Sequence, residues 1–159
     1  RSGARVGDRI LATGQFGGSI LGRHFDFQPR VAEALLLNER YEIHAAIDVS
    51  DGLTLDLARL AAESGVGVEL DLSVVPISPD AHRLALESQD GVSPLDHALG
   101  DGEDFELLLA APPEMARRIV AEQPLVTGIA DLGECIAAPG LWAAGSPRRP
   151  LAPRGYLHT

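Results

Sequence analysis

The chain has 159 residues, 45% of them hydrophobic but only 4% aromatic, which suffices for one folded domain whose core is built mainly from Ala, Leu and Val. Its formal net charge of −10 argues against nonspecific binding to nucleic acids or anionic membranes, although bound Mg²⁺ would still admit a phosphate ligand. The single cysteine, Cys135, excludes an internal disulfide and a Cys-rich metal site, so we expect a cytoplasmic protein.

Neither membrane-spanning nor secretory segments are visible in the sequence. No apolar run approaches the ~18 residues that a transmembrane helix needs, and no signal peptide pattern is found. The first residues read RSGARVGD, without an initiating methionine. We therefore expect the chain to be a fragment or a processed product of something longer.

Strand and helix patterns alternate from the start of the chain. A short strand is expected over 8–14, followed by a Gly-rich segment over 15–22 that contains a possible helical turn. A helix is expected over 27–41, with Pro29 in its first turn. The segment 43–49 is rich in Ala and β-branched residues, which predicts a strand buried on both faces.

The next segment has the clearest helical pattern in the chain. Its apolar residues recur three and four positions apart, as on one face of a helix. Gly65 suits the C-cap, because glycine readily adopts the left-handed conformation found there. The apolar stripe consists of Leu53, Leu57, Leu60 and Ala61.

The rest of the chain continues the alternation. Strands alternating with helices imply a sheet covered by helices, and the unequal spacing favours a mixed sheet, hence the α+β class. Ser78 and Pro79 suit the N-cap and the first turn of a helix. The remaining elements are expected as a strand over 66–72, a helix over 78–88, a loop with a short helix over 89–102, a strand over 105–112, a helix over 113–122, one or two closing strands over 124–134 and 135–143, and an extended tail over 145–159.

Two carboxylates three residues apart stand where the strand over 43–49 gives way to the helix. Asp48 and Asp51 are accompanied by Ser50 and Gly52. Ligands of α/β proteins collect at the carboxyl ends of strands, and Mg²⁺ takes one or two carboxylates while phosphates and water complete its shell. The Ser50 hydroxyl could bond a phosphate oxygen, and Gly52 would let a ligand approach the backbone at the helix N-terminus.

Helix capping is the alternative explanation for the same residues. Ser50 or Asp51 would suit an N-cap, and each acid gains from the helix dipole. Asp48 distinguishes the two explanations, because an acid at the end of a buried strand is a poor cap and is costly to bury unless it is paired.

A second acidic loop precedes the strand over 105–112. Its carboxylates, Asp101, Glu103 and Asp104, alternate with two glycines. A solvated turn would explain this loop in isolation. Because both acidic segments adjoin an apolar strand, together they favour one shared site for phosphate and Mg²⁺.

Four quoted segments carry a resemblance to a known family. IDVSDGL, SGVGVELDLSVVPISP, ALGDGEDFELLLAAP and GYLHT resemble, in order, the C-terminal domain of thiamine-monophosphate kinase, within the aminoimidazole ribonucleotide synthetase-like superfamily. The resemblance implies a three-layer α/β/α sandwich with a mixed sheet, with residues 1–159 forming a single C-terminal-type domain. The family's N-terminal ATP-binding domain, through which it forms a homodimer, would be absent from this chain, which alone should be inactive.

The resemblance also implies a reaction and residue roles. The reaction is phosphoryl transfer from ATP to thiamine monophosphate, giving thiamine diphosphate, with Mg²⁺ ions. Because the acceptor is already a phosphate oxygen, alignment and charge neutralisation suffice without a strong general base. The implied contacts are Asp48 and Asp51 with Mg²⁺, Ser50 and Arg1 with ATP, and Glu103 and Tyr156 with the substrate.

Some features depart from the family pattern and keep alternatives open. The loop reads GDGED where a double glycine is common, and the chain ends in GYLHT where an aspartate and a terminal phenylalanine are usual. The segment GQFGGS lacks the Lys-Ser/Thr of a phosphate-binding P-loop and is expected to be structural. The alternatives are a noncatalytic binding or scaffold domain of the same fold, or another superfamily branch: a purine-synthesis ligase, a selenophosphate enzyme or a hydrogenase-maturation protein.

Overall fold

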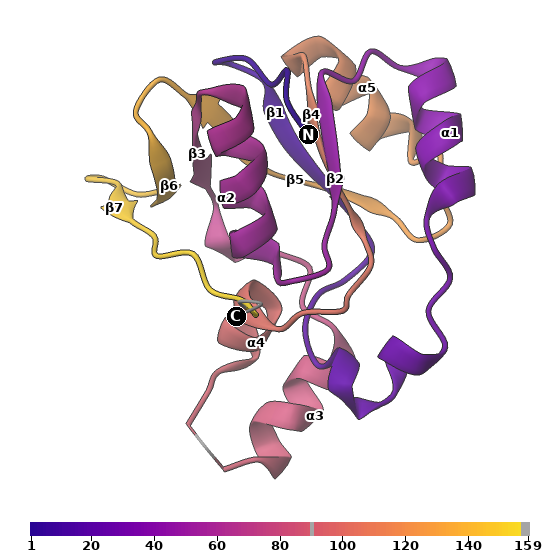
Figure 1. The fold of residues 1–159 in the computed structure, drawn as a ribbon, viewed down its shortest axis with the longest axis vertical. Coiled ribbons are helices and arrows are strands. Elements are labelled where there is room, and N and C mark those ends of the chain that lie inside the picture. Colours follow the sequence, from indigo (N-terminus) through magenta and orange to yellow (C-terminus); the bar gives the residue numbers. More distant parts are fainter. Residues whose placement is uncertain (90, 157–159) are drawn as a thin grey trace.

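A single mixed sheet organises the molecule. The computed structural model describes residues 1–89 and 91–156, and in them seven strands pair in the order β2-β4-β1-β5-β3-β6-β7 (Figure 1). Neighbouring strands are antiparallel except β3 and β6, which are parallel. The strands are β1 (Arg9–Thr13), β2 (Ala45–Asp48), β3 (Gly67–Leu70), β4 (Leu107–Ala111), β5 (Ile129–Ile136), β6 (Gly140–Ala143) and β7 (Arg149–Pro150).

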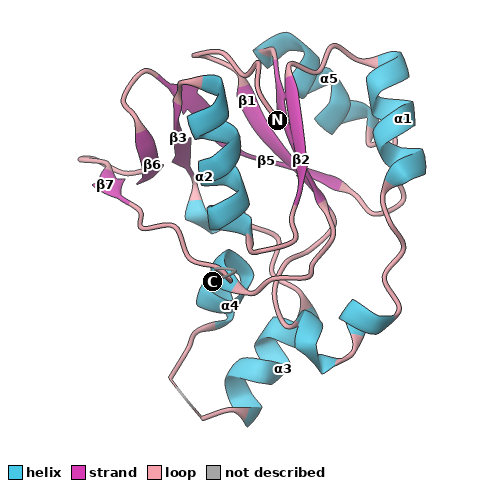
Figure 2. Ribbon diagram, in the orientation of Figure 1, coloured by secondary structure: helices cyan, strands magenta, loops and turns pink. Residues whose placement is uncertain are grey.

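Helices cover both faces of the sheet (Figure 2). In the described residues, α2 lies over one face, and α1 and α5 lie over the other. The helices are α1 (Val31–Arg40), α2 (Leu53–Ser64), α3 (Pro79–Glu87), α4 (Pro94–Gly100) and α5 (Pro113–Glu122), with short 3-10 helices η1 (Ser19–Leu21), η2 (Arg23–Phe25) and η3 (Leu72–Val74).

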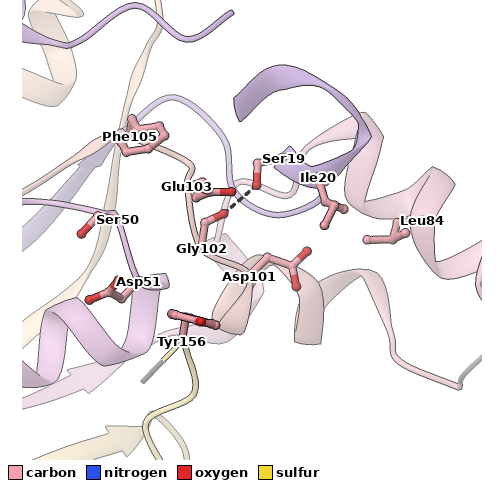
Figure 3. A pocket seen from close by; sticks show the side chains of 10 residues that line it. All are labelled: Ser19, Ile20, Ser50, Asp51, Leu84, Asp101, Gly102, Glu103, Phe105 and Tyr156. Atoms are coloured by element: carbon pink, nitrogen blue, oxygen red, sulfur yellow. Dashed lines mark hydrogen bonds between the residues drawn. The ribbon is translucent and has the colours of Figure 1, made fainter. Parts of the chain in front are cut away.

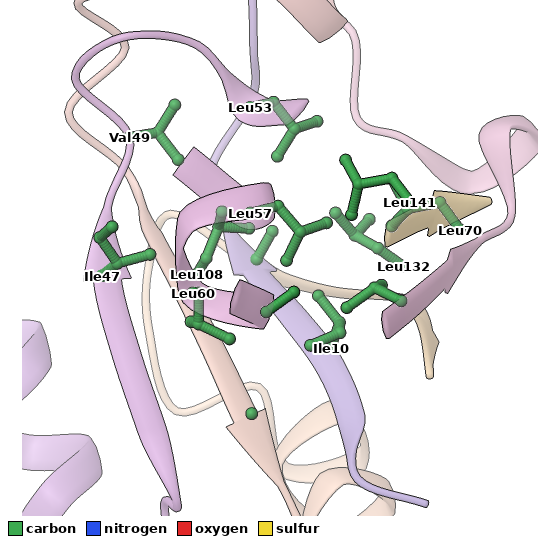
Figure 4. Packing of buried hydrophobic residues seen from close by; sticks show 14 of the residues in the cluster. Ile10, Ile47, Val49, Leu53, Leu57, Leu60, Leu70, Leu108, Leu132 and Leu141 are labelled. Carbon is green, nitrogen blue, oxygen red and sulfur yellow. The ribbon is translucent and has the colours of Figure 1, made fainter. Parts of the chain in front are cut away.

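Two hydrophobic cores form because side chains of a strand alternate between its faces. In β4, Leu108 and Ala110 point to the core beneath α2, whereas Leu109 and Ala111 point to the core beneath α1 and α5. Figure 4 shows the first of these cores. Helices on two opposite cores confirm the predicted three-layer α/β/α sandwich with a mixed sheet.

Helix α2 follows its sequence pattern closely. The predicted apolar stripe is fully buried, and Gly65 ends the helix in the left-handed conformation, with φ 70°. Its N–H donates to the carbonyl groups of Ala61 and Ala62. The helix begins five residues after β2 ends, so the turn that contains Asp48 and Asp51 is held between two ordered elements.

Two local predictions are wrong. Pro29 lies before α1, not in its first turn, since the N-cap is Arg30. Strand β2 is not buried on both faces: Ala45 and Ile47 are buried, whereas Ala46 and Asp48 are exposed. The reason is that β2 is an edge strand, where the helices on that face leave alternate side chains in solvent.

The closing part of the chain also differs in its boundaries. Strand β5 runs through the expected break at residues 134 and 135, and the two-residue strand β7 adds an edge to β6. His158 and the other final residues of GYLHT lie outside the described residues. In the part of the chain that the structure describes, no helix combines the length and apolar character needed to cross a membrane.

Candidate functional site

A pocket of about 730 Å³ opens beside the N-terminal end of α2 (Figure 3). Ser50 and Asp51 lie on one side of it, and Ile20 and Leu84 lie on the other. Its lining combines carboxylates with apolar and aromatic groups. The remaining lining residues are Ser19, Asp101, Gly102, Glu103, Phe105 and Tyr156.

Backbone hydrogen bonds join three distant segments around this pocket. The acidic turn after β2 accepts N–H groups from the second acidic loop and from the C-terminal tail. Predicted site residues from each of the three segments, namely Ser50 and Asp51, Glu103, and Tyr156, are therefore brought together. The three bonds, each 2.8 Å long, run from Glu103 N to Ser50 O, from Phe105 N to Val49 O and from Tyr156 N to Asp51 O.

A buried carboxylate that the sequence analysis missed fixes the acidic turn. The Asp56 side chain is 1% exposed, and its Oδ2 accepts the N–H groups of Ser50 at 3.0 Å and Asp51 at 2.8 Å. The N-cap of α2 is Gly52, and no side chain caps the helix. Capping by Ser50 or Asp51 is therefore contradicted, and Asp56 orders the turn from inside the helix instead.

Arg59 completes this network. One of its nitrogens donates to Asp56 Oδ1 at 2.7 Å and also to the carboxylate of Asp51. The spacing of Asp56 and Arg59, three residues apart on a predicted helix, is the sequence signal that could have indicated their pairing. The contact of Arg59 with Asp51 depends on the fold and had no such signal.

Asp48 lies at the exposed end of β2 and does not line the pocket. Among the described residues, none donates a hydrogen bond to its carboxylate. The expectation that burial makes this carboxylate costly is therefore wrong, because the edge position leaves it in solvent. Asp48 is thus exposed to solvent at the last position of β2, two residues before Ser50.

Two of the three carboxylates in the second acidic loop serve the fold. Asp104 is buried, accepts the Gly17 N–H at 3.0 Å and pairs with Arg23; burial raises the pKa of Asp104 to about 7, against the opposing effect of Arg23. Asp101 accepts the Gly18 N–H at 2.8 Å. These bonds occupy two amides of GQFGGS, as a structural role for that segment requires, and they contradict a merely solvated turn.

Glu103 is the carboxylate of this loop that lies exposed in the pocket. Its φ of 63° and the φ of 52° at Phe105 are left-handed, a conformation that is costly for residues other than glycine. Stacking of Phe105 on Phe27, with ring centroids 3.8 Å apart, helps to hold the loop. A Cβ at Gly102 would lie 2.8 Å from Ser50 O, so the tight approach of loop and turn requires glycine there.

The C-terminal tail is clasped against the start of α2. Thr54 Oγ1 donates to Leu99 O at 2.9 Å and accepts the N–H of Arg154 at 2.9 Å. A Cβ at Gly52 would lie 2.9 Å from Gly100 O, so the close approach of the protein's own backbone requires glycine at this position. This clasp holds Tyr156 at the pocket.

Arg1 is a predicted site residue that lies far from the pocket. Its carbonyl oxygen lies 3.5 Å from Ser64 Oγ, at the C-terminal end of α2. Ser50 and Asp51 precede the other end of this 12-residue helix, which is ~18 Å long. The structure thus brings Ser50, Asp51, Glu103 and Tyr156 to one pocket, leaves Asp48 outside its lining and leaves Arg1 at the far end of α2.

The oxygen atoms of the acidic turn can supply only part of the coordination shell of Mg²⁺. Within residues 1–89 and 91–156, no group of three or more His, Cys, Asp or Glu side chains is arranged to hold a metal ion. Mg²⁺ commonly uses one or two carboxylates and takes its other ligands from phosphates and water. Asp48 and Asp51, with the Ser50 hydroxyl nearby, fit that mode of binding.

Comparison with known protein families decides the classification. Residues 8–141 match the family model "AIR synthase related protein, C-terminal domain". The chain belongs to this family. The match includes both acidic segments.

Curated relatives of the chain are thiamine-monophosphate kinases. The Rhodopirellula baltica enzyme is 44% identical over 160 residues, which are 99% of this chain and 50% of the relative. The Methanospirillum hungatei enzyme is 33% identical, over 99% of this chain and 52% of the relative. The chain therefore spans about half the length of the curated relatives it matches.

Solved structures share the fold of this chain. AaThiL complexed with AMPPCP and TMP superimposes with a TM-score of 0.75 at 25% identity, covering 99% of this chain and 53% of that one. Escherichia coli HypE has a TM-score of 0.73 at 21% identity, covering 94% of this chain and 50% of that one. The HypE similarity establishes the shared fold alone.

Proposed function

We propose that this chain is the C-terminal domain of an ATP-dependent kinase that converts thiamine monophosphate to thiamine diphosphate. The observation that carries the proposal is the convergence of the Ser50–Asp51 turn, Glu103 and Tyr156 on one pocket. The similarity to thiamine-monophosphate kinases supports it further. A solved relative holding AMPPCP and TMP supports nucleotide and phosphate-bearing ligands for this fold.

The acidic turn would serve the polyphosphate side of the site. Asp48 and Asp51 would hold Mg²⁺, which would neutralise phosphate charge, and the Ser50 hydroxyl would donate to a phosphate oxygen of ATP. Asp56 fixes the backbone of this turn through two N–H groups, so its side chains need little reorganisation when a ligand binds. The chain's own contribution is thus alignment of charges.

The loop and the tail would serve the substrate side. The Glu103 carboxylate suits the cationic ring of thiamine, and the Tyr156 ring would pack on it. The acceptor is a phosphate oxygen that is already ionised, so no residue needs to remove a proton from it. Correct placement of the two substrates is then the main demand on the protein.

Further parts of the proposal concern the complete enzyme. The domain would act together with an N-terminal ATP-binding domain, through which a homodimer would form, and it would be inactive without that domain. An Arg1 contact with ATP would depend on the same domain. A cytoplasmic location fits an enzyme that uses ATP and keeps its one cysteine, Cys135, as a buried thiol with its pKa raised to about 12 by burial.

A chimeric enzyme tests this function. Residues 1–159 would replace the matching C-terminal half of the Rhodopirellula baltica kinase, and formation of thiamine diphosphate from ATP and thiamine monophosphate would be measured. We expect turnover that needs Mg²⁺ and is lost when Glu103 and Tyr156 are both replaced by alanine. A folded chimera that binds ATP but neither binds nor phosphorylates thiamine monophosphate would contradict the proposal and favour a noncatalytic or different superfamily branch.

A further inference from the structure

Arg59 lies between two carboxylates, one buried within the fold and one lining the pocket. The Asp56 side chain is 1% exposed and accepts two N–H groups of the turn besides Arg59. Asp51 lines the pocket with a side chain that is 13% exposed. The Arg59 nitrogen that bridges them belongs to a side chain that is one-third exposed.

The two contacts of Arg59 therefore differ in how easily each can be broken. Asp56 cannot turn away without leaving the Ser50 and Asp51 amides unpaired, which makes its position fixed. Asp51 faces the cavity in which a ligand would lie. The positive charge of Arg59 consequently occupies one side of the carboxylate that the proposed function assigns to Mg²⁺.

A resident positive charge has a predictable effect on a second cation. Like charges a few ångströms apart near a protein surface repel each other more strongly than they do in bulk water, and Mg²⁺ carries two charges. Arg59 therefore opposes Mg²⁺ at Asp51 when no other anion is present. A polyphosphate adds several negative charges and reverses that balance.

We propose that Arg59 is a positioning residue that serves as the built-in counter-cation of Asp51, keeping Mg²⁺ affinity low until a polyphosphate enters the pocket. This inference rests on the proposed function, because it takes Asp51 to be a Mg²⁺ ligand. It adds that the metal site is conditional: Arg59 aims the carboxylate in the absence of metal, and Mg²⁺ binds productively only together with its phosphate ligands.

Thermal unfolding of the 159-residue chain across a MgCl₂ series at constant ionic strength tests the inference. The variants are Arg59→Gln and Arg59→Met, which remove the charge but retain a long side chain of good helix propensity. Without Mg²⁺ both should unfold at a lower temperature than the wild type, because Asp51 and Asp56 then repel each other. Mg²⁺ should raise their Tm more than that of the wild type, with a dissociation constant about tenfold lower.

Matched variants separate this effect from general loss of an ion pair. Arg83→Gln removes an arginine paired with Asp80 and Glu87 on α3, and its Mg²⁺ response should equal that of the wild type. Arg59→Lys keeps the charge and should lie nearer to the wild type than to Arg59→Gln. A merely structural role for Arg59 would lower the Tm but leave the Mg²⁺ dependence unchanged.

The contrary outcomes are distinct. Equal Mg²⁺ responses in wild type, Arg59→Gln and Arg59→Met would overturn the inference, as would failure of Mg²⁺ to restore folding if both variants are unfolded without it. Adding Asp51→Asn to Arg59→Gln should abolish the gained response. If the gain survives that second change, Asp51 is not the ligand, and the inference fails together with the metal role that the proposed function gives to Asp51.

Discussion

The backbone N–H of Tyr156 donates to the carbonyl oxygen of Asp51 at 2.8 Å. Residues 105 positions apart in the chain are thereby locked into one wall of the pocket. A Cβ at Gly155 would lie 2.3 Å from the same oxygen, so the contact requires glycine just before the tyrosine. The tail is thus part of the site, and its docking should control substrate binding.

Thr54→Val tests the docking of the tail. Valine has the shape of threonine but lacks the hydroxyl that bonds Leu99 O and the Arg154 N–H. Because this side chain is buried, the loss should lower the free energy of unfolding by about 1–3 kcal/mol. Chemical denaturation would measure it, with Thr54→Ser, which keeps the hydroxyl, as the control; equal losses in both variants would contradict the clasp.

Glu103→Gln tests the substrate side of the pocket. The change removes the negative charge of an exposed carboxylate, so affinity for thiamine monophosphate should fall about tenfold while Tm stays near that of the wild type. Calorimetric titration of the chimeric enzyme would measure the affinity. Glu114→Gln, on the exposed surface of α5, should leave it unchanged. Retention of full affinity by Glu103→Gln would count against the assigned role.

Asp104 should make the stability of the fold depend on pH. Its pKa in the folded chain is raised by burial from 3.8 to about 7, so the folded state holds a proton that the unfolded state has released. Stability from this group is fully present below about pH 4 and is lost as the pH rises through about 7. The free energy of unfolding should therefore fall from about pH 5 to pH 8, and Asp104→Asn should flatten that fall. An equal slope in both proteins would show that other groups cause it.

Local patterns predicted most of the fold. The apolar stripe of α2, its Gly65 end and the Ser78–Pro79 start of α3 are all observed, because periodicity and capping act over a few residues. The prediction for β2 failed because edge position is a property of the sheet. Nothing in the segment 43–49 reveals that, among the described residues, β4 would be the one strand paired with β2.

The sequence predicted which acidic residues belong to the candidate site but not how their side chains are arranged and paired. The sequence indicated that Asp51 and Glu103 would share a pocket, and they do. The sequence could not indicate that Asp104 would accept a hydrogen bond from Gly17 and pair with Arg23, because those partners lie more than 80 positions away. No side chain takes the capping role considered for Ser50 or Asp51. The Asp56 carboxylate, in the first turn of α2, instead accepts the backbone N–H groups of both residues.

Asp48 offers the most direct test of Mg²⁺ binding by the acidic turn, because its carboxylate is exposed and bonds to no other group in the described residues. Asp48→Asn should therefore leave Tm unchanged, so any loss of binding is a property of the site. The measurement is titration of AMPPCP into the chimeric enzyme with Mg²⁺ and with EDTA. Asp48→Asn should weaken binding by at least about tenfold with Mg²⁺ and have no effect with EDTA; equal affinity for Mg²⁺-bound AMPPCP in both proteins would show that Asp48 does not bind the metal.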